Sequence, residues 1–455
     1  MKRTIALGWT VVVSACPARA GADEAPAAPP SPASLADVDA LRSELARQAE
    51  AIAELRRRAS GVVAATEGTT LRVSGYVQVD WVVDNQASQD EVDFSTNLPL
   101  NQDRFTLRRG HVRLDAERGL VSAALEIDAN TVSGPQVRPI DAELKVRWPA
   151  KAADGAPSIE ASLGLMKIPF GFEVPELDQV RPFLERAAVL RALFPGEFDL
   201  GARLSLGYRS FEWAIALMNG NPIGDKVFPA LAPVGTKELV GRLGTHVDVV
   251  QGVRLELGVS ADTGLGFHEG TPTTKDQLVW RDENGDGLVQ PSEIQVIPGS
   301  AATPSQQFRR FAIGADARVI ARVPRLGDLA VRAEIVRGQN LDRGIEYADP
   351  VGAGHDLREL GWYIGFSQEI TRWAMVGVRY DRYDPDEDAS VGLAANLVPV
   401  DRTYTTLALM AMLRFESARL VVEYDKNDNA LGRDATGAPT TLADDALTLR
   451  GQVRF

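Results

Sequence analysis

The stretch that decides the fold is residues 447–455, LTLRGQVRF. Two sets of side chains alternate along it: Leu447, Leu449, Gly451, Val453 and Phe455 against Thr448, Arg450, Gln452 and Arg454. Successive side chains of a β-strand point to opposite faces, so this strand has an apolar face and a polar face. Such a strand suits a sheet with lipid on one side and water on the other.

The same period of two residues continues upstream, beginning at Leu71. Residues 71–83 alternate apolar and polar side chains, and residues 121–130 place Glu126 and Asp128 on the polar face. Residues 140–148 place Asp141 and Lys145 there. These faces are too charged for the dry core of a β-sandwich, so the pattern favours a barrel with a water-filled lumen.

The alternation predicts an all-β protein, a 16-stranded antiparallel transmembrane β-barrel. The predicted strands are 71–83, 104–116, 121–130, 140–148, 159–168, 200–209, 211–219, 238–247, 254–262, 310–322, 329–337, 360–367, 373–381, 404–415, 419–425 and 447–455. An even number is expected when both ends of a single-chain barrel lie in the periplasm. Tight joints at 116–120, 209–210 and 371–372 contrast with long ones at 170–199, 266–308 and 384–403. Short turns on one rim and long loops on the other are typical of such barrels.

The first residues predict export. Lys2 and Arg3 precede an apolar run too short to span a bilayer, and Ala18-Arg19-Ala20 provides a cleavage site, so residues 1–20 are a predicted signal peptide. An alternative is lipidation of Cys16, because residues 13–16 resemble a lipobox. Cys16 is the only cysteine, so cleavage after Ala20 would leave a mature chain without disulfides.

Four further segments follow. Residues 21–34 are a predicted disordered Pro/Ala-rich linker, 35–60 a periplasmic coiled-coil helix, 61–70 a second linker and 71–455 the barrel. The helix is inferred from spacings of three and four residues between Val38, Leu41, Leu45, Gln48, Ile52 and Leu55. So short a coiled coil is marginal alone, which favours a homotrimer already held together by its barrels; a lone helix beside the barrel is the alternative.

The charge balance limits the partners. Without Lys2, Arg3 and Arg19, the 49 basic residues become 46 against 62 acidic residues, a net charge of −16. This balance argues against nucleic acid or an anionic bilayer surface as a partner. The chain also lacks the run of about 20 apolar residues that a membrane helix requires.

Three stretches resemble the phosphate- and polyphosphate-selective porins of Gram-negative outer membranes: RFTLRRGHVRLDA at 104–116, GLMKIPFGFE at 164–173 with the following FLERA and PGEFDLGARLSLGY, and the last strand. The resemblance implies a trimeric 16-stranded channel whose third loop folds into the lumen, with basic residues guiding anions by passive diffusion. It also implies that the last strand is recognised by the barrel assembly machinery.

Five residues are candidates for the anion pathway. Arg108, Arg109 and Lys167 are assigned by the resemblance, whereas Arg203 and Arg242 have the inward parity of their strands. Arg108 and Arg109 are adjacent, so a regular strand would turn one of them toward lipid; a bulge near Gly110 or a position near a rim would avoid that cost.

These basic residues also have a structural alternative. The wall arginines could pair across the lumen with carboxylates, namely Asp128, Glu143, Glu212, Glu256 and Asp316. The acidic balance and the absence of a dense lysine cluster depart from the family pattern. A channel for small anions or for hydrophilic solutes in general is therefore expected more firmly than one for phosphate alone.

Residues 282–293, DENGDGLVQPSE, match the twelve-residue calcium loop. The expected ligands are Asp282, Asn284, Asp286, Leu288 through its carbonyl, Gln290 and Glu293, with Gly287 at the turn. The sequence thus predicts a weak Ca²⁺ site in an extracellular loop. A solvated acidic loop is the alternative, and no cofactor is required.

An enzyme and a structural tether are two other functions that an outer-membrane barrel can have. Some outer-membrane barrels are hydrolases, but the four histidines are scattered and no GxSxG or HExxH motif occurs, so an enzyme is least expected. A structural tether, in which the helix contacts the cell wall and the barrel is an anchor, would not need charged inward faces.

Overall fold

The computed structural model describes residues 62–66, 68–84, 104–132, 134–149, 156–223, 233–393, 396–430, 432–433, 439–441 and 444–455. The predicted signal peptide with Cys16, the Pro/Ala-rich linker and the coiled-coil helix lie outside these residues. Residues 62–66, which the sequence analysis places in the second linker, form strand β1 (Val62–Thr66), and β1 pairs with the start of the first barrel strand.

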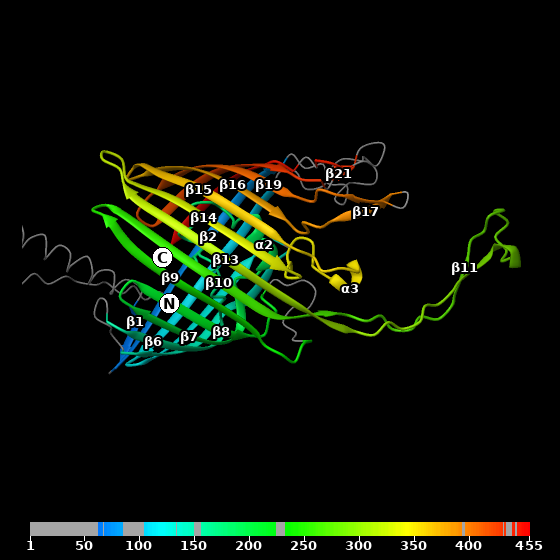
Figure 1. Cartoon of the computed structure of the whole chain (residues 1–455), viewed down its shortest axis with the longest axis horizontal. Coiled ribbons are helices and arrows are strands. Elements are labelled where there is room, and N and C mark those ends of the chain that lie inside the picture. Colours follow the sequence, from blue (N-terminus) through cyan, green and yellow to red (C-terminus); the bar gives the residue numbers. More distant parts are fainter. Residues whose placement is uncertain are drawn as a thin grey trace, which may run out of the picture. The chain divides into compact units, whose positions relative to one another are not determined.

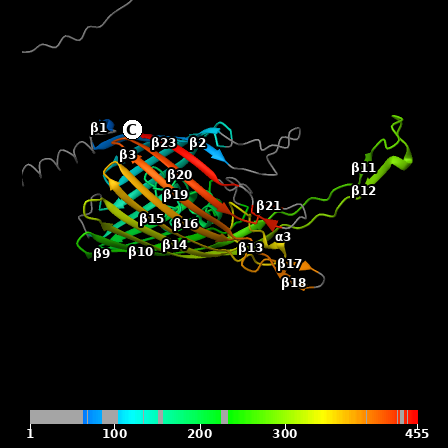
Figure 2. The same cartoon turned by 90° about the horizontal axis from the view of Figure 1, so that it is seen from above.

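Sixteen long strands form one closed antiparallel barrel, which Figures 1 and 2 show from two sides. They are β2 (Thr69–Asp84), β3 (Arg104–Arg118), β4 (Val121–Asn130), β5 (Gln136–Trp148), β6 (Ser158–Lys167), β7 (Phe198–Tyr208), β8 (Phe211–Met218), β9 (Glu238–Val250), β10 (Val253–His268), β13 (Gln306–Arg322), β14 (Asp328–Gln339), β15 (Leu360–Thr371), β16 (Ala374–Asp384), β19 (Tyr404–Arg414), β20 (Ala418–Asp428) and β23 (Ala446–Arg454). Each pairs with the next, and β23 pairs with β2 from Tyr76 opposite Arg454 to Asp84 opposite Ala446. This last pairing closes the barrel.

These strands confirm the predicted fold. Every predicted strand is present, and β4 begins and ends at the predicted residues, Val121 and Asn130. The largest extension is in β10, which continues six residues beyond the predicted end, Asp262, to His268. Alternation predicted these strands well because each has one face on lipid and one on the barrel interior.

The outer face of the barrel is apolar. Along β16, Val376, Val378 and Tyr380 are exposed. Arg379 and Asp381, which point to the other face of the strand, are 3% and 1% exposed. In water this arrangement would bury the charged groups and expose the apolar ones. It fits a strand whose outer side contacts lipid and whose charged side chains are paired inside the barrel.

Aromatic pairs lie toward the two ends of the strands. Trp81 stacks on Phe105 with ring centroids 5.9 Å apart, near the end of β2, and Trp373 lies 6.4 Å from Phe415 beside two tight turns. Exposed aromatic side chains at these levels are typical of the two membrane–water interfaces. Among the described residues, no helix is long and apolar enough to cross a membrane.

The two rims differ as predicted. Turns of two residues join β3 to β4, β7 to β8 and β9 to β10 at one rim. The connections at the other rim are longer, and several carry elements of their own: α2 (Ala188–Leu193), β11 (Gln277–Trp280), η1 (Pro291–Glu293), β12 (Ile294–Ile297), α3 (Pro350–Ala353), β17 (Ser390–Leu393), β18 (Asn396–Pro399), β21 (Gly432–Arg433) and β22 (Pro439–Thr440). The sequence analysis did not foresee these short strands and helices.

The connection between β6 and β7, residues 168–197, folds into the barrel and is called the inner loop below. It carries α2, whose side chains are mostly buried. Ile168, Phe170 and Leu190 of the loop pack against inward-facing side chains of the wall, including Val240 and Val336, in one apolar cluster. Polar inward faces were expected on nearly every strand, and this apolar part of the wall is an exception, because the loop needs an apolar surface against which to bury its own apolar side chains.

Candidate functional site: the inner loop and the lumen wall

The inner loop is anchored on one wall by a buried carboxylate as well as by its apolar side chains. Glu334 of β14 accepts hydrogen bonds from the backbone N–H groups of Phe172 and Glu173, at 3.1 and 2.7 Å, and from the hydroxyl of Tyr363 at 2.9 Å. An unpaired buried N–H group would destabilise the loop, so these bonds fix the start of the loop against β14 and β15.

The middle of the loop is bound to a second part of the wall by side chains of β20 and β23. Arg419 donates to the carbonyl oxygens of Arg181 and Asp178, at 2.7 and 2.9 Å. Arg450 donates to the carbonyl of Leu184 at 2.8 Å. The loop therefore leaves the wall at β6 and is bound to it again at two separate places inside the lumen, which narrows the interior.

Arg108 and Arg109 both lie at this second part of the wall. Gln78 of β2 is opposite Arg109 while the next residue, Val79, is opposite Leu107, so Arg108 is the extra residue of a β-bulge. The bulge turns both guanidinium groups inward, which solves the problem that adjacency poses in a regular strand. It lies two residues before Gly110, near the predicted position.

Both arginines bind acids of the inner loop. The Arg108 guanidinium holds both carboxylate oxygens of Glu185, with N–O distances of 2.8 and 2.9 Å. Arg109 contacts Glu185 at 3.2 Å and Asp178 at 3.1 Å. Glu185 and Asp178 were not predicted as partners, because they meet the arginines only when the loop folds inward.

These contacts set the ionisation of the two acids. Burial opposes ionisation of Glu185, but the guanidinium groups of Arg108 and Arg109 outweigh it and hold the pKa of this carboxyl well below its usual range. Burial likewise opposes ionisation of Asp178, and Arg109 and Arg181 outweigh it and lower its pKa. Both groups are therefore carboxylates at neutral pH.

The other three candidates are also paired. Lys167 lies at the end of β6, as expected, and its Nζ is 2.8 Å from Glu197. Arg203 is 3.4 Å from Glu143, and Arg242 is 2.5 Å from Asp316. The structure therefore brings Arg108 and Arg109 together and places Arg203 beside Lys167, whose carbonyl oxygen accepts a hydrogen bond from Arg203 at 3.1 Å, whereas Arg242 lies in a separate pair. Glu143 and Asp316 are two of the carboxylates expected in the structural alternative, and contact with a permeating anion stays a prediction for all five basic residues.

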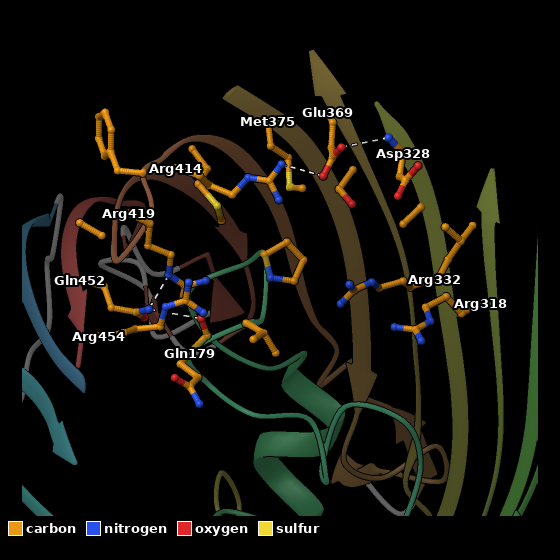
Figure 3. Close-up of a pocket in the computed structure, with 18 residues that line it drawn as sticks. Gln179, Arg318, Asp328, Arg332, Glu369, Met375, Arg414, Arg419, Gln452 and Arg454 are labelled. Carbon is orange, nitrogen blue, oxygen red and sulfur yellow. Dashed lines mark hydrogen bonds and ion pairs between the residues drawn. The ribbon is translucent and has the colours of Figure 1, made fainter. Parts of the chain in front are cut away.

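A cavity of about 330 Å³ lies between the inner loop and the rim of short turns and is called the vestibule (Figure 3). Five arginines and two acids are among its lining residues: Arg318, Arg332, Arg414, Arg419 and Arg454 with Asp328 and Glu369. Glu369 pairs with Arg414, and Arg318 and Arg332 pair with Glu256 and Glu176. The positive charge of the vestibule therefore depends on Arg419 and Arg454.

Arg419 and Arg454 differ from the other wall arginines. Arg419 donates to Gln452 at 3.0 Å and to two loop carbonyls, and Arg454 donates to the carbonyl of Glu416 at 3.3 Å. Within the described part of the chain, neither is ion-paired with a carboxylate. Neither arginine was predicted as a site residue, although Arg454 is on the polar face of residues 447–455. The one signal in the sequence that could have identified Arg454 is that the neighbouring strands place no acidic residue beside it.

The predicted calcium loop is the tip of a hairpin, in which β11 pairs with β12 from Gln277 opposite Ile297 to Trp280 opposite Ile294. Asp282 accepts hydrogen bonds from the N–H groups of Gly285 and Gly287, at 2.6 and 2.8 Å. Glu293 accepts one from the Trp280 indole at 3.2 Å. Across the described residues, no three His, Cys, Asp or Glu side chains converge on a metal position.

Together, the closed sixteen-stranded barrel, its apolar outer face and the loop inside its lumen define a transmembrane β-barrel with a narrowed interior. The chain is similar in structure to the outer membrane channel DcaP of Acinetobacter baumannii, with a TM-score of 0.53 and 12% identity over 87% of this chain and 100% of that one. It is also similar to an anion-selective porin from Comamonas acidovorans, with a TM-score of 0.48 and 10% identity over 85% of this chain and 100% of that one. It is similar as well to OprB of Pseudomonas putida, with a TM-score of 0.47 and 12% identity over 85% of this chain and 94% of that one.

No protein-family model matches the sequence, and no curated protein matches it. At these identities the likeness concerns the fold. Antiparallel barrels with an apolar outer band and a polar interior are the form in which proteins cross the outer membrane of Gram-negative bacteria. The fold therefore agrees with the outer-membrane location that the sequence predicts.

Proposed function

We propose that the chain is an outer-membrane porin through which small hydrophilic solutes diffuse passively, with a preference for anions. The observation that carries the preference is the vestibule, where Arg419 and Arg454 have no carboxylate partner among the described residues. A basic constriction or mouth raises the local anion concentration and lowers that of cations.

Planar-bilayer recording tests this proposal. The purified protein should give stepwise currents, and its reversal potential in a potassium chloride gradient should indicate chloride preference. Replacing Arg419 and Arg454 with glutamine should lower the chloride-to-potassium permeability ratio by roughly two- to fivefold, because two uncompensated charges are lost from the mouth. Arg372→Gln is the matched control: this arginine stacks on Trp373 at a turn of the same rim, so its loss should leave the ratio unchanged.

The alternative functions predict different outcomes in bilayer recordings and in an assay of ester hydrolysis. Currents without ion preference would mean a non-selective porin. No current from a folded barrel would favour the structural tether, and ester hydrolysis by the folded protein would favour an enzyme. Phosphate or polyphosphate as the physiological solute is a narrower form of the same proposal, tested by adding each anion to one side of the bilayer.

A homotrimer is proposed for the assembly. The apolar outer wall offers the surface for such contacts, and the expected coiled coil of residues 35–60 would add to them. Cross-linking in detergent should then give a species of three chains. Recognition of the last strand by the barrel assembly machinery is proposed on the alternation of residues 447–455, and replacing Phe455 with serine should slow insertion in cells.

A further inference from the structure

Three arginines from two strands surround the carboxylate of Glu185. Arg108 and Arg109 come from β3, and Arg450 comes from β23, which is separated from β3 by β2. Arg108 contacts both oxygens at 2.8 and 2.9 Å, Arg109 contacts them at 3.3 and 3.2 Å, and Arg450 contacts one at 3.0 Å. One loop carboxylate thus accepts five hydrogen bonds from three guanidinium groups.

This arrangement has the chemistry of an oxyanion site. A guanidinium group presents paired N–H donors that match two oxygens of a carboxylate or a phosphate, and such bidentate pairs are short and directional. Arg109 also pairs with Asp178 at 3.1 Å, and Arg450 also pairs with Asp80 at 2.7 Å. Arg108 has no acid other than Glu185 among the described residues, so loss of the Glu185 charge would leave the site positive.

Solvent reaches one side of this site. The side chains of Arg108 and Glu185 are each 30% exposed, whereas those of Arg450 and Asp80 are 2% and 5% exposed. The buried pair forms the base of the site, and the exposed pair forms its opening. A solute in the lumen can therefore approach Arg108 without unfolding the loop.

The backbone next to Glu185 is fixed independently of its carboxylate. The N–H of Leu184 donates to Glu423 at 3.0 Å, and the carbonyl of Glu185 accepts from Arg379 at 2.7 Å. The side chain of Glu185 can therefore change its rotamer while the loop stays in place. Displacement of the Glu185 side chain from the arginines breaks its ion pairs but leaves the fold of the loop unchanged.

We propose that Arg108, Arg109 and Arg450 form a binding site for a permeating oxyanion, a carboxylate or phosphate group, and that Glu185 occupies it as a resident competitor. This inference rests on the proposed porin function. An entering oxyanion exchanges with Glu185, which swings aside and returns when the anion leaves. Glu185 would thereby keep anions from binding so tightly that they block the channel, since conduction requires weak binding.

The test uses Glu185→Gln in the full-length protein, with inorganic phosphate as the probe in planar bilayers. The variant should raise the chloride-to-potassium permeability ratio, and phosphate should inhibit its chloride current at concentrations about tenfold lower than in the wild type, because the charged competitor is gone. Adding Arg108→Gln to this variant should abolish the gain. Acetate as a second probe distinguishes carboxylate from phosphate as the preferred group.

Glu387→Gln is the matched control, because Glu387 has the same side-chain exposure as Glu185, 30%, but lies in the connection after β16 and is bound to a single arginine, Arg337; its loss should leave phosphate inhibition at the wild-type value. Equal phosphate inhibition of the wild type and a folded Glu185→Gln variant would overturn the inference, even if the channel prefers anions. A gain in phosphate inhibition in a channel that prefers cations would support the inference and contradict the proposed anion preference. If Glu185→Gln does not fold, Glu185→Asp, which shortens the reach of the carboxylate, should give a smaller gain, and no gain would overturn the inference.

Discussion

At the scale of single residues, the sequence identified Arg108 and Arg109 but not their partners. Two adjacent arginines in an alternating strand are visible in the sequence, because one of them breaks the pattern. Glu185 and Asp178 lie in a loop without a regular period, and their meeting with the arginines depends on the path of the whole loop. The two bases were therefore assigned through the resemblance of residues 104–116 to a porin strand, whereas no pattern in the loop indicated the acids.

The acids of the inner loop predict how the channel responds to pH. The folded-state pKa values of Glu185 and Asp178 are lowered, so their contribution to loop stability is fully present above the unfolded values and is lost as the pH falls through the folded ones. The change in single-channel conductance that depends on these two acids should therefore occur only below about pH 4. A transition near pH 6 that is present in the wild type and absent from the Glu185→Gln variant would contradict this account of the loop.

At the scale of elements, the bulge in β3 is a discrete unit. Arg108 is extra relative to β2, and also relative to β4, because Thr131 exchanges hydrogen bonds with Leu107 while His111 is opposite Asp128. Without Arg108, Leu107 and Arg109 would be consecutive residues paired with Val79 and Gln78, which are also consecutive. The side chains on each side of the deletion would therefore keep their lipid-facing or lumen-facing positions.

Deletion of Arg108 should therefore give a folded barrel. Deletion of Val112, from the regular part of β3, should not, since one part of the strand would then turn its polar face to lipid. The measurement is the shift in electrophoretic mobility between unheated and heated samples in dodecyl sulfate. Loss of the folded band in both deletions would show that the bulge is required for the barrel itself.

The calcium hairpin makes a second prediction for an element. Titration calorimetry of the refolded protein should show Ca²⁺ binding with a Kd on the order of 10⁻⁴ to 10⁻³ M, and Glu293→Gln should abolish it, because position 12 supplies two ligand oxygens. Glu283→Gln, at the non-ligand second position, is the control and should bind like the wild type. No heat from the wild-type protein would leave the loop an acidic hairpin held by its own backbone N–H groups.

The inner loop shows where element prediction from sequence fails. The strands were predicted because lipid on one face and the lumen on the other produce an alternation of apolar and polar residues. The apolar contact between the loop and the wall produces no such periodic pattern, only isolated apolar residues on the inner face. One example is the run Leu407 to Leu413, in which Ala408, Met410 and Met412 are buried inside the barrel between outward-facing leucines. Apolar residues on both faces of a strand indicate that something other than water covers the inner face.

At the scale of the whole molecule, the lipid-facing surface predicts a dependence on depth. Leu409 lies at the middle of β19 and Leu413 near its end, and both are exposed on the outer face. Leu409→Arg should destabilise the barrel by about 2 to 4 kcal/mol, and Leu413→Arg by about 0 to 1 kcal/mol. Urea titration of refolding into phospholipid bilayers measures both. Equal costs would mean that β19 does not span the membrane along its length.

The pairing of β2 with β23 joins residues that are far apart in the chain: Gln78 donates to Gln452 at 2.7 Å, and Arg450 holds Asp80. Until β23 has been synthesised, the free edge of β2 has no final partner, and the sheet remains open with two edges exposed. Closure of the barrel therefore has to follow the synthesis of β23, and earlier intermediates expose strand edges that are prone to aggregate.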